Sequence, residues 1–137
     1  MVGTEAVVAD LKRYEGFEGF PYDDSLGKPT IGIGCLLPLS QDEAEVLAMM
    51  RLYDTLTEMA PVLDGLPAEL KPAAREVLVD MAYNLGVPRL KGFKRMFAAL
   101  QGLDYKAAAD EMLDSRWASQ VGIRATELSA KMRNAGR

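Results

Sequence analysis

The first apolar pattern in the chain has the period of an α-helix. Four apolar residues recur three and four positions apart: Val7, Val8, Leu11 and Tyr14. They predict a helix over about residues 4–14, with Thr4 as its N-cap because a threonine hydroxyl can accept a backbone N–H of the first turn. The helix should end where GFEGFPYDDSLGKP begins, since two glycines, a proline and an Asp-Asp-Ser cluster do not continue a helix.

The pattern then changes to the period of a β-strand. TIGIGCLL, residues 30–37, predicts a strand, and we expect a small antiparallel sheet between Phe20 and Leu37 with a turn near residues 25–28. Two glycines inside a strand require a reason, because glycine packs no side chain and loses the most backbone entropy. Either the chain bends at Gly32 and Gly34, or something large lies against this backbone.

Helical patterns dominate the remainder. Ser40 and Glu43 form a capping-box signature for a helix over about residues 41–60, which Pro61 should end. Pro72 starts the most apolar helix, which should close at Gly86. Its predicted core residues are Val77, Leu78, Met81, Ala82 and Leu85. Further helices are expected at about 93–100, at 105–113 after the candidate N-cap Asp104, and at about 123–134.

Composition limits the chemistry that this chain can perform. Its 137 residues suit one compact domain, and no stretch approaches 18 uninterrupted apolar residues. The acidic, amphipathic start lacks the features of a signal peptide, which predicts synthesis and retention in the cytoplasm. The chain has one cysteine and no histidine, which excludes an internal disulfide, Ser-His-Asp and Cys-His catalysis, and histidine-ligated zinc. Carboxylates are therefore the leading proton carriers.

The net charge of −4 hides an asymmetry between the two halves. Residues 1–70 carry 4 basic and 13 acidic side chains, whereas residues 71–137 carry 12 and 7. The acidic total disfavours nonspecific binding to DNA or to anionic membranes. The basic second half could still face an anionic polymer.

Four carboxylates lie within ten residues of one another: Glu15, Glu18, Asp23 and Asp24. Composition alone would place them on a solvent-exposed loop. Glu15, however, follows Tyr14 and precedes Phe17, where partial burial would favour the protonated form that a general acid needs. Glycosidic bonds are commonly cleaved by two carboxyl groups, although the sequence separation does not distinguish an inverting from a retaining arrangement.

The same stretch carries a family resemblance. YEGFEGFPYDDSLGKPTIGIGCLL, residues 14–37, strongly resembles the phage-type lysozymes, the muramidase family of the T-even phage endolysin, which are glycoside hydrolases. The resemblance continues through LSQDEAEVL, DMAYNLG, the Gly-Phe pair at 92–93 and SRWASQVGIRA. It implies that Glu15 is the general acid, that Asp24 directs the attacking water and that Thr30 orients it. In such inverting enzymes the two carboxyl groups lie roughly 6.5–9.5 Å apart.

The resemblance also implies residues that hold the substrate or the acid. The substrate-binding positions are Gly32, Asn84, Gly86 and Gln120, and Arg124 would pair with the acid Glu15. Asn84 could instead be a helix cap and Arg124 a cation at a helix end. Trp117 could stack on a sugar, but the family position favours the core of the helical lobe.

Two positions depart from the family pattern. Cys35 stands where the family often has a histidine, and Arg51 replaces the acidic partner of that histidine. The lost ion pair should affect stability and leave the chemistry intact.

The resemblance implies an α+β, mainly helical, two-lobed fold of the lysozyme type. The single domain, residues 1–137, would comprise a small β-containing lobe at about 14–45, a linking helix at about 41–60, and a helical lobe of about 1–13 plus 61–137. The implied activity is hydrolysis of the β-1,4 bond between N-acetylmuramic acid and N-acetylglucosamine in bacterial peptidoglycan. A lytic transglycosylase and a non-catalytic wall-binding module remain the alternatives.

The expected partners follow from the same resemblance. Peptidoglycan is the substrate, no cofactor or metal is needed, and neither nucleic acid nor a stable membrane association is expected. A monomer made in the host cytoplasm without a signal peptide would need a holin or a similar export partner to reach the wall.

Overall fold

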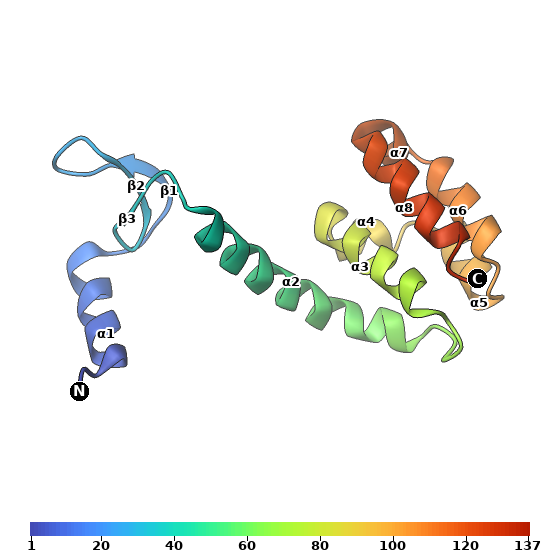
Figure 1. Ribbon diagram of the computed structural model, residues 1–137, viewed down its shortest axis with the longest axis horizontal. Coiled ribbons are helices and arrows are strands. Elements are labelled where there is room, and N and C mark those ends of the chain that lie inside the picture. The colour runs from blue at the N-terminus through green and yellow to red at the C-terminus, as the bar shows by residue number, and fades with distance from the viewer. The chain divides into compact units, whose positions relative to one another are not determined.

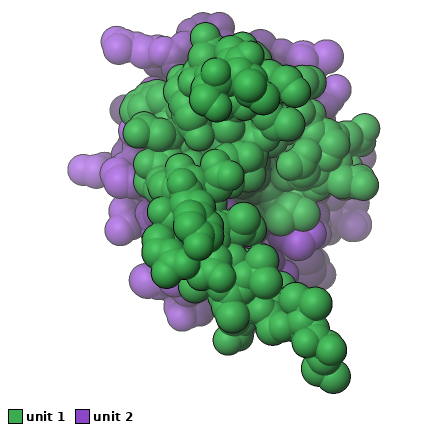
Figure 2. All heavy atoms as spheres, turned by 90° about the vertical axis from the view of Figure 1, so that its left-hand side faces the viewer, with its two compact units in different colours: residues 1–47 green, residues 48–137 purple.

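A computed structural model describes all residues, 1–137, and shows an α+β fold that is mainly helical. Eight helices and one three-stranded antiparallel sheet make up the chain (Figure 1). The chain divides into two compact units, residues 1–47 and 48–137, which Figure 2 colours separately. The predicted fold class is confirmed. The expected association of residues 1–13 with the helical lobe stays a prediction.

Helix α1, Thr4–Glu15, forms where the apolar period predicts it. The N-cap is Gly3, with no side-chain cap, so the expectation that Thr4 caps this helix is wrong. Gly16 ends the helix with φ +68°, a conformation that glycine adopts without steric cost, and its N–H donates to the Lys12 carbonyl at 3.0 Å. The catalytic candidate Glu15 is therefore the last helical residue.

The sheet has the order β1-β2-β3, with strands Glu18–Asp23, Pro29–Gly32 and Cys35–Leu36. The turn between β1 and β2 lies where the sequence predicts it. The expectation that TIGIGCLL forms a single strand is wrong, because the chain reverses at residues 33–34 and β3 runs antiparallel to β2. Gly32 and Gly34 have φ of +71° and +64°, which disfavours any other residue type at this reversal. The glycines therefore mark a bend.

Helix α2, Gln41–Asp64, begins with the predicted capping box. The Ser40 N–H donates to Glu43 Oε1 at 3.0 Å, and the Glu43 N–H donates to Ser40 Oγ at 3.1 Å. The boundary between the two units falls inside this helix. Pro61 does not end α2, which continues to Asp64. The expected end at Pro61 is therefore wrong: the proline removes one backbone donor from the helix, but its fixed φ is compatible with helical geometry.

Four helices of the second unit match the predicted positions: α3 Pro72–Leu85, α5 Lys94–Gln101, α6 Tyr105–Leu113 and α8 Ile123–Arg133. Asp104 caps α6 as expected, accepting the Ala107 N–H at 3.0 Å. Two short helices were not predicted: α4, Val87–Leu90, and α7, Arg116–Val121. At four and six residues they are too short to show a clear helical period.

The core of the second unit is built around α3. Val77, Leu78 and Met81 are completely buried there, as the sequence predicts, and Ala82 is 2% exposed. Apolar side chains of α5, α6 and α8 complete this core: Met96, Leu100, Ala108, Met112 and Met132. Leu85 packs against the core but is only partly buried. None of the helices is long and apolar enough to cross a membrane.

Candidate active site

Glu15 lies at the carboxyl end of α1, in the first unit together with Asp24 and Thr30. Its side chain is exposed, and the neighbouring Tyr14 and Phe17 are themselves 75% and 76% exposed. These two aromatic residues therefore do not provide the partial burial expected from the sequence. The β2–β3 turn lies against this side chain, because a β-carbon built on Gly34 would meet the Glu15 side chain.

Asp24 organises the turn between β1 and β2. Its Oδ1 atom accepts the N–H of Leu26 at 2.9 Å and the N–H of Lys28 at 2.8 Å. The side chain is half-buried, and Oδ2 has no hydrogen-bond donor from the protein. The carboxylate thus stabilises the turn through one oxygen and leaves the other free for a water or a substrate.

Thr30 is in the central strand β2, opposite Tyr22 and Leu36, and is only 2% exposed. Its hydroxyl donates to the Lys28 carbonyl at 2.9 Å. The Asp24 N–H donates to the same carbonyl, also at 2.9 Å. The backbone of Lys28 therefore connects the two residues predicted to handle the attacking water. Because the Thr30 proton is engaged, its oxygen can only accept a hydrogen bond from a further group.

Gly32 ends β2 opposite Glu18. A β-carbon built on Gly32 would meet no atom within 4 Å, so the space beside this residue is open. The predicted contact between Gly32 and the substrate needs such space, and it stays a prediction.

Asn84 and Trp117 meet in the second unit. The Trp117 indole Nε1–H donates to Asn84 Oδ1 at 2.9 Å. Trp117 is 2% exposed and packs edge-to-face on Phe93, with ring centroids 6.2 Å apart. The prediction that Trp117 belongs to the core is confirmed. Asn84 is exposed and keeps its amide N–H groups free for another partner.

Arg124 is bound to Asp80, a residue that the sequence analysis did not single out. Its Nε donates to Asp80 Oδ1 at 3.0 Å, and its Nη2 donates to the same oxygen. Asp80 and Asn84 are four residues apart on α3, so this face of α3 binds α7 through Trp117 and α8 through Arg124. That spacing within DMAYNLG was the available signal for Asp80. The predicted pairing of Arg124 with Glu15 is not tested.

The remaining predicted binding residues are also in the second unit. Gly86 ends α3 with φ +86°, and its N–H donates to the Ala82 carbonyl at 2.8 Å. Gln120 is exposed on α7. The close approach of Gly34 to Glu15 was not predicted; the glycines of TIGIG indicated only that the chain bends or that something large lies against this backbone.

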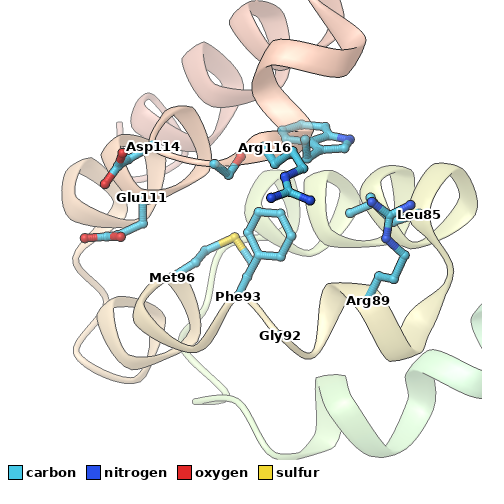
Figure 3. A pocket seen from close by; sticks show the side chains of 10 residues that line it. Leu85, Arg89, Gly92, Phe93, Met96, Glu111, Asp114 and Arg116 are labelled. Atoms are coloured by element: carbon cyan, nitrogen blue, oxygen red, sulfur yellow. The ribbon is translucent and has the colours of Figure 1, made fainter.

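A pocket of about 260 Å³ opens in the second unit between α5, the end of α6 and α7. Figure 3 shows the Arg116 side chain extending toward the Phe93 ring, with Glu111 and Asp114 across the pocket from Arg89. The core residues Leu85, Phe93, Met96 and Trp117 line it, but no predicted catalytic or substrate-binding residue does. Nowhere in the chain do three or more aspartate, glutamate or cysteine side chains gather as a metal site would require.

Comparison with known proteins identifies the family. The sequence model of the family described as phage lysozyme matches residues 12–135, which include Glu15, Asp24 and Thr30. No curated protein matches the chain. Because the family match covers nearly all of its 137 residues, the chain belongs to the phage lysozyme family of endolysin-type cell-wall hydrolases.

Proposed function

We propose that the protein is a muramidase that hydrolyses the β-1,4 bond between N-acetylmuramic acid and N-acetylglucosamine in peptidoglycan. The observation that carries this proposal is the shared hydrogen bonding at Lys28. Asp24 and Thr30 both donate to its carbonyl oxygen, which places a free carboxylate oxygen and a hydroxyl acceptor on adjoining backbone. Family membership supplies the substrate class.

The proposed reaction inverts the anomeric carbon. Glu15 donates its proton to the leaving glycosidic oxygen, and Asp24 accepts a proton from the water that attacks the opposite face of the sugar. Thr30 accepts the second hydrogen of that water, because its own hydroxyl hydrogen is used at Lys28. The carboxylate of Glu15 and the carboxylic acid of Asp24 then exchange protons with solvent before the next turnover.

The second unit would contribute to substrate binding. We assign contacts with the glycan or its peptide to Asn84, Gly86 and Gln120, together with Gly32 of the first unit. Asn84 would use its amide N–H groups, since its oxygen is bound to Trp117. We also propose, on the family resemblance alone, that Arg124 pairs with Glu15; within its own unit the Arg124 guanidinium is bound to Asp80.

The test is a wall-clearing assay of wild type beside Glu15→Gln. The glutamine side chain has nearly the same shape but no acidic proton, so clearing of purified cell walls should fall by about 10²–10⁴-fold. Glu18→Gln is a matched control, because Glu18 is another exposed acid in the same cluster. Circular dichroism should be the same for all three proteins. Substantial clearing by Glu15→Gln would refute the assignment.

Product analysis separates the alternatives. A hydrolase leaves a reducing muramic acid end, whereas a lytic transglycosylase leaves an anhydro sugar that is lighter by one water. Mass spectrometry of the released fragments should show the reducing product. Retention on purified walls without any clearing by the wild type would instead favour a wall-binding module.

The cellular setting is proposed on the family alone. We place synthesis in the host cytoplasm and action at the wall after release by a holin or a similar partner. The protein would work as a monomer without a cofactor.

A further inference from the structure

We propose that Gly34 is a positioning residue for the acid Glu15, and that this position must lack a side chain for the enzyme to work. The proposal rests on the assignment of Glu15 as general acid. It extends that assignment by naming the residue on which the acid side chain lies.

The geometric evidence is a close approach between two distant points of the sequence. A β-carbon built on Gly34 would lie 2.7 Å from Glu15 Cδ, 2.7 Å from Oε2 and 2.9 Å from Cγ. Carbon atoms in contact normally lie about 3.5–4.0 Å apart. The end of the Glu15 side chain therefore occupies the volume that any side chain at position 34 would need.

Backbone conformation alone does not explain this arrangement. Gly32 and Gly34 have similar positive φ angles, +71° and +64°, so both favour glycine for the same local reason. Only Gly34 has the acid against it, because a β-carbon on Gly32 would meet nothing within 4 Å. Glycine at position 34 thus meets two requirements: the positive φ of the turn, and the absence of a side chain where the end of Glu15 lies.

The contact connects the acid to the sheet that carries Thr30. Glu15 ends α1, whereas Gly34 lies in the turn between β2, which contains Thr30, and β3. The Glu15 carboxyl makes no hydrogen bond within the protein, and the end of its side chain lies against Gly34. A methyl group at position 34 would turn this flexible side chain aside and would move the proton away from the glycosidic oxygen. The positive φ of Gly34 adds backbone strain to any such substitution, which a control variant must also carry.

The experiment compares Gly34→Ala with Gly122→Ala. Gly122 also has a positive φ, +59°, but a β-carbon there would meet no atom within 4 Å, so alanine imposes backbone strain without displacing an acid. Gly34→Asn is a second variant, because asparagine tolerates positive φ better and should fold if alanine does not. Each protein is labelled with ¹³C at the glutamate side-chain carboxyl, and the Glu15 resonance is identified by its loss in Glu15→Gln.

We expect Gly34→Ala and Gly34→Asn to shift the Glu15 carboxyl resonance and to lower kcat on soluble peptidoglycan by about 10–100-fold. KM should change by less than about twofold, since the glycan contacts are intact. Gly122→Ala should leave the resonance in place and kcat within about twofold of wild type.

An unshifted Glu15 resonance in both Gly34 variants would overturn the inference whatever the activity of the enzyme. A wild-type kcat in these variants, with Glu15→Gln inactive, would overturn it while the proposed function stands. Activity in Glu15→Gln would instead refute the proposed function, and the carboxyl resonance would still report whether the contact exists.

Discussion

Asp24 has two roles, one in stability and one in catalysis, and two substitutions can distinguish them. Its Oδ1 atom accepts two backbone hydrogen bonds and stabilises the turn, while Oδ2 is free to act as the base. Asp24→Asn keeps an oxygen at Oδ1 and removes the negative charge. Asp24→Ala removes both the acceptor and the charge. The two variants should therefore agree in activity and differ in stability.

The expected stability difference follows from the two lost hydrogen bonds. Each contributes about 0.5–1.5 kcal/mol, and the exposed N–H groups of Leu26 and Lys28 can bond to water once the carboxylate is gone. Asp24→Ala should thus lower the free energy of unfolding by about 1–2 kcal/mol. Asp24→Asn keeps the acceptor oxygen and both hydrogen bonds in weaker, uncharged form and should cost less than about 1 kcal/mol. Urea unfolding followed by circular dichroism measures both values.

The expected activity is the same for the two variants. Loss of a general base reduces the rate by about 10²–10⁴-fold, and neither asparagine nor alanine can accept the proton of the attacking water. The assay is clearing of purified walls, with Asp23→Asn as the matched control from the same Asp-Asp pair. If Asp24→Asn clears walls at the wild-type rate while Asp24→Ala does not, Asp24 only stabilises the turn. That result would favour a transglycosylase, which needs the acid alone.

Two further predictions concern stability. Asn84→Ala should lower the free energy of unfolding, measured in urea, by about 1–3 kcal/mol, because the buried Trp117 N–H loses its acceptor. Asn84→Asp keeps an acceptor oxygen and should lose less. Equal stability of the alanine variant and wild type would contradict this prediction. The pKa of Glu43 lies below its usual range because the Ser40 backbone N–H, and then the Ser40 hydroxyl, bond to its carboxylate. A carboxyl group with a lowered folded-state pKa stabilises the protein above its unfolded-state pKa, and this stabilisation is lost as pH falls through the folded-state pKa. The difference in free energy of unfolding between wild type and Glu43→Gln should therefore shrink as pH is lowered from 6. A difference that does not change with pH would refute this prediction.

The helical part of the fold was predictable from local signals. α3 begins at a proline, places its apolar residues on one face and ends at a glycine, and each of these features acts within a few residues. α2 shows where a local signal fails: Pro61 removes one backbone donor but keeps a helical φ, and the helix continues past it to Asp64. α4 and α7 formed without a detectable period, and α7 depends on the Ser115 cap and on burial of Trp117.

The glycines of TIGIG show why the site itself was harder to predict. Alternating apolar residues favour one strand over residues 30–37, but the chain reverses at Gly34, and the contact that accompanies this reversal is with Glu15, nineteen positions earlier. A pattern of hydrophobic and polar residues carries no information about such a contact, because the glycine contributes only the absence of a side chain. The motif therefore predicts roles for Glu15, Asp24 and Thr30, whereas the reason for the second glycine is visible only in the three-dimensional structure. If the Gly34 variants behave as expected, position 34 must be glycine chiefly because the Glu15 side chain occupies the space beside it. The positive φ of the turn is then the weaker of the two reasons for a glycine there.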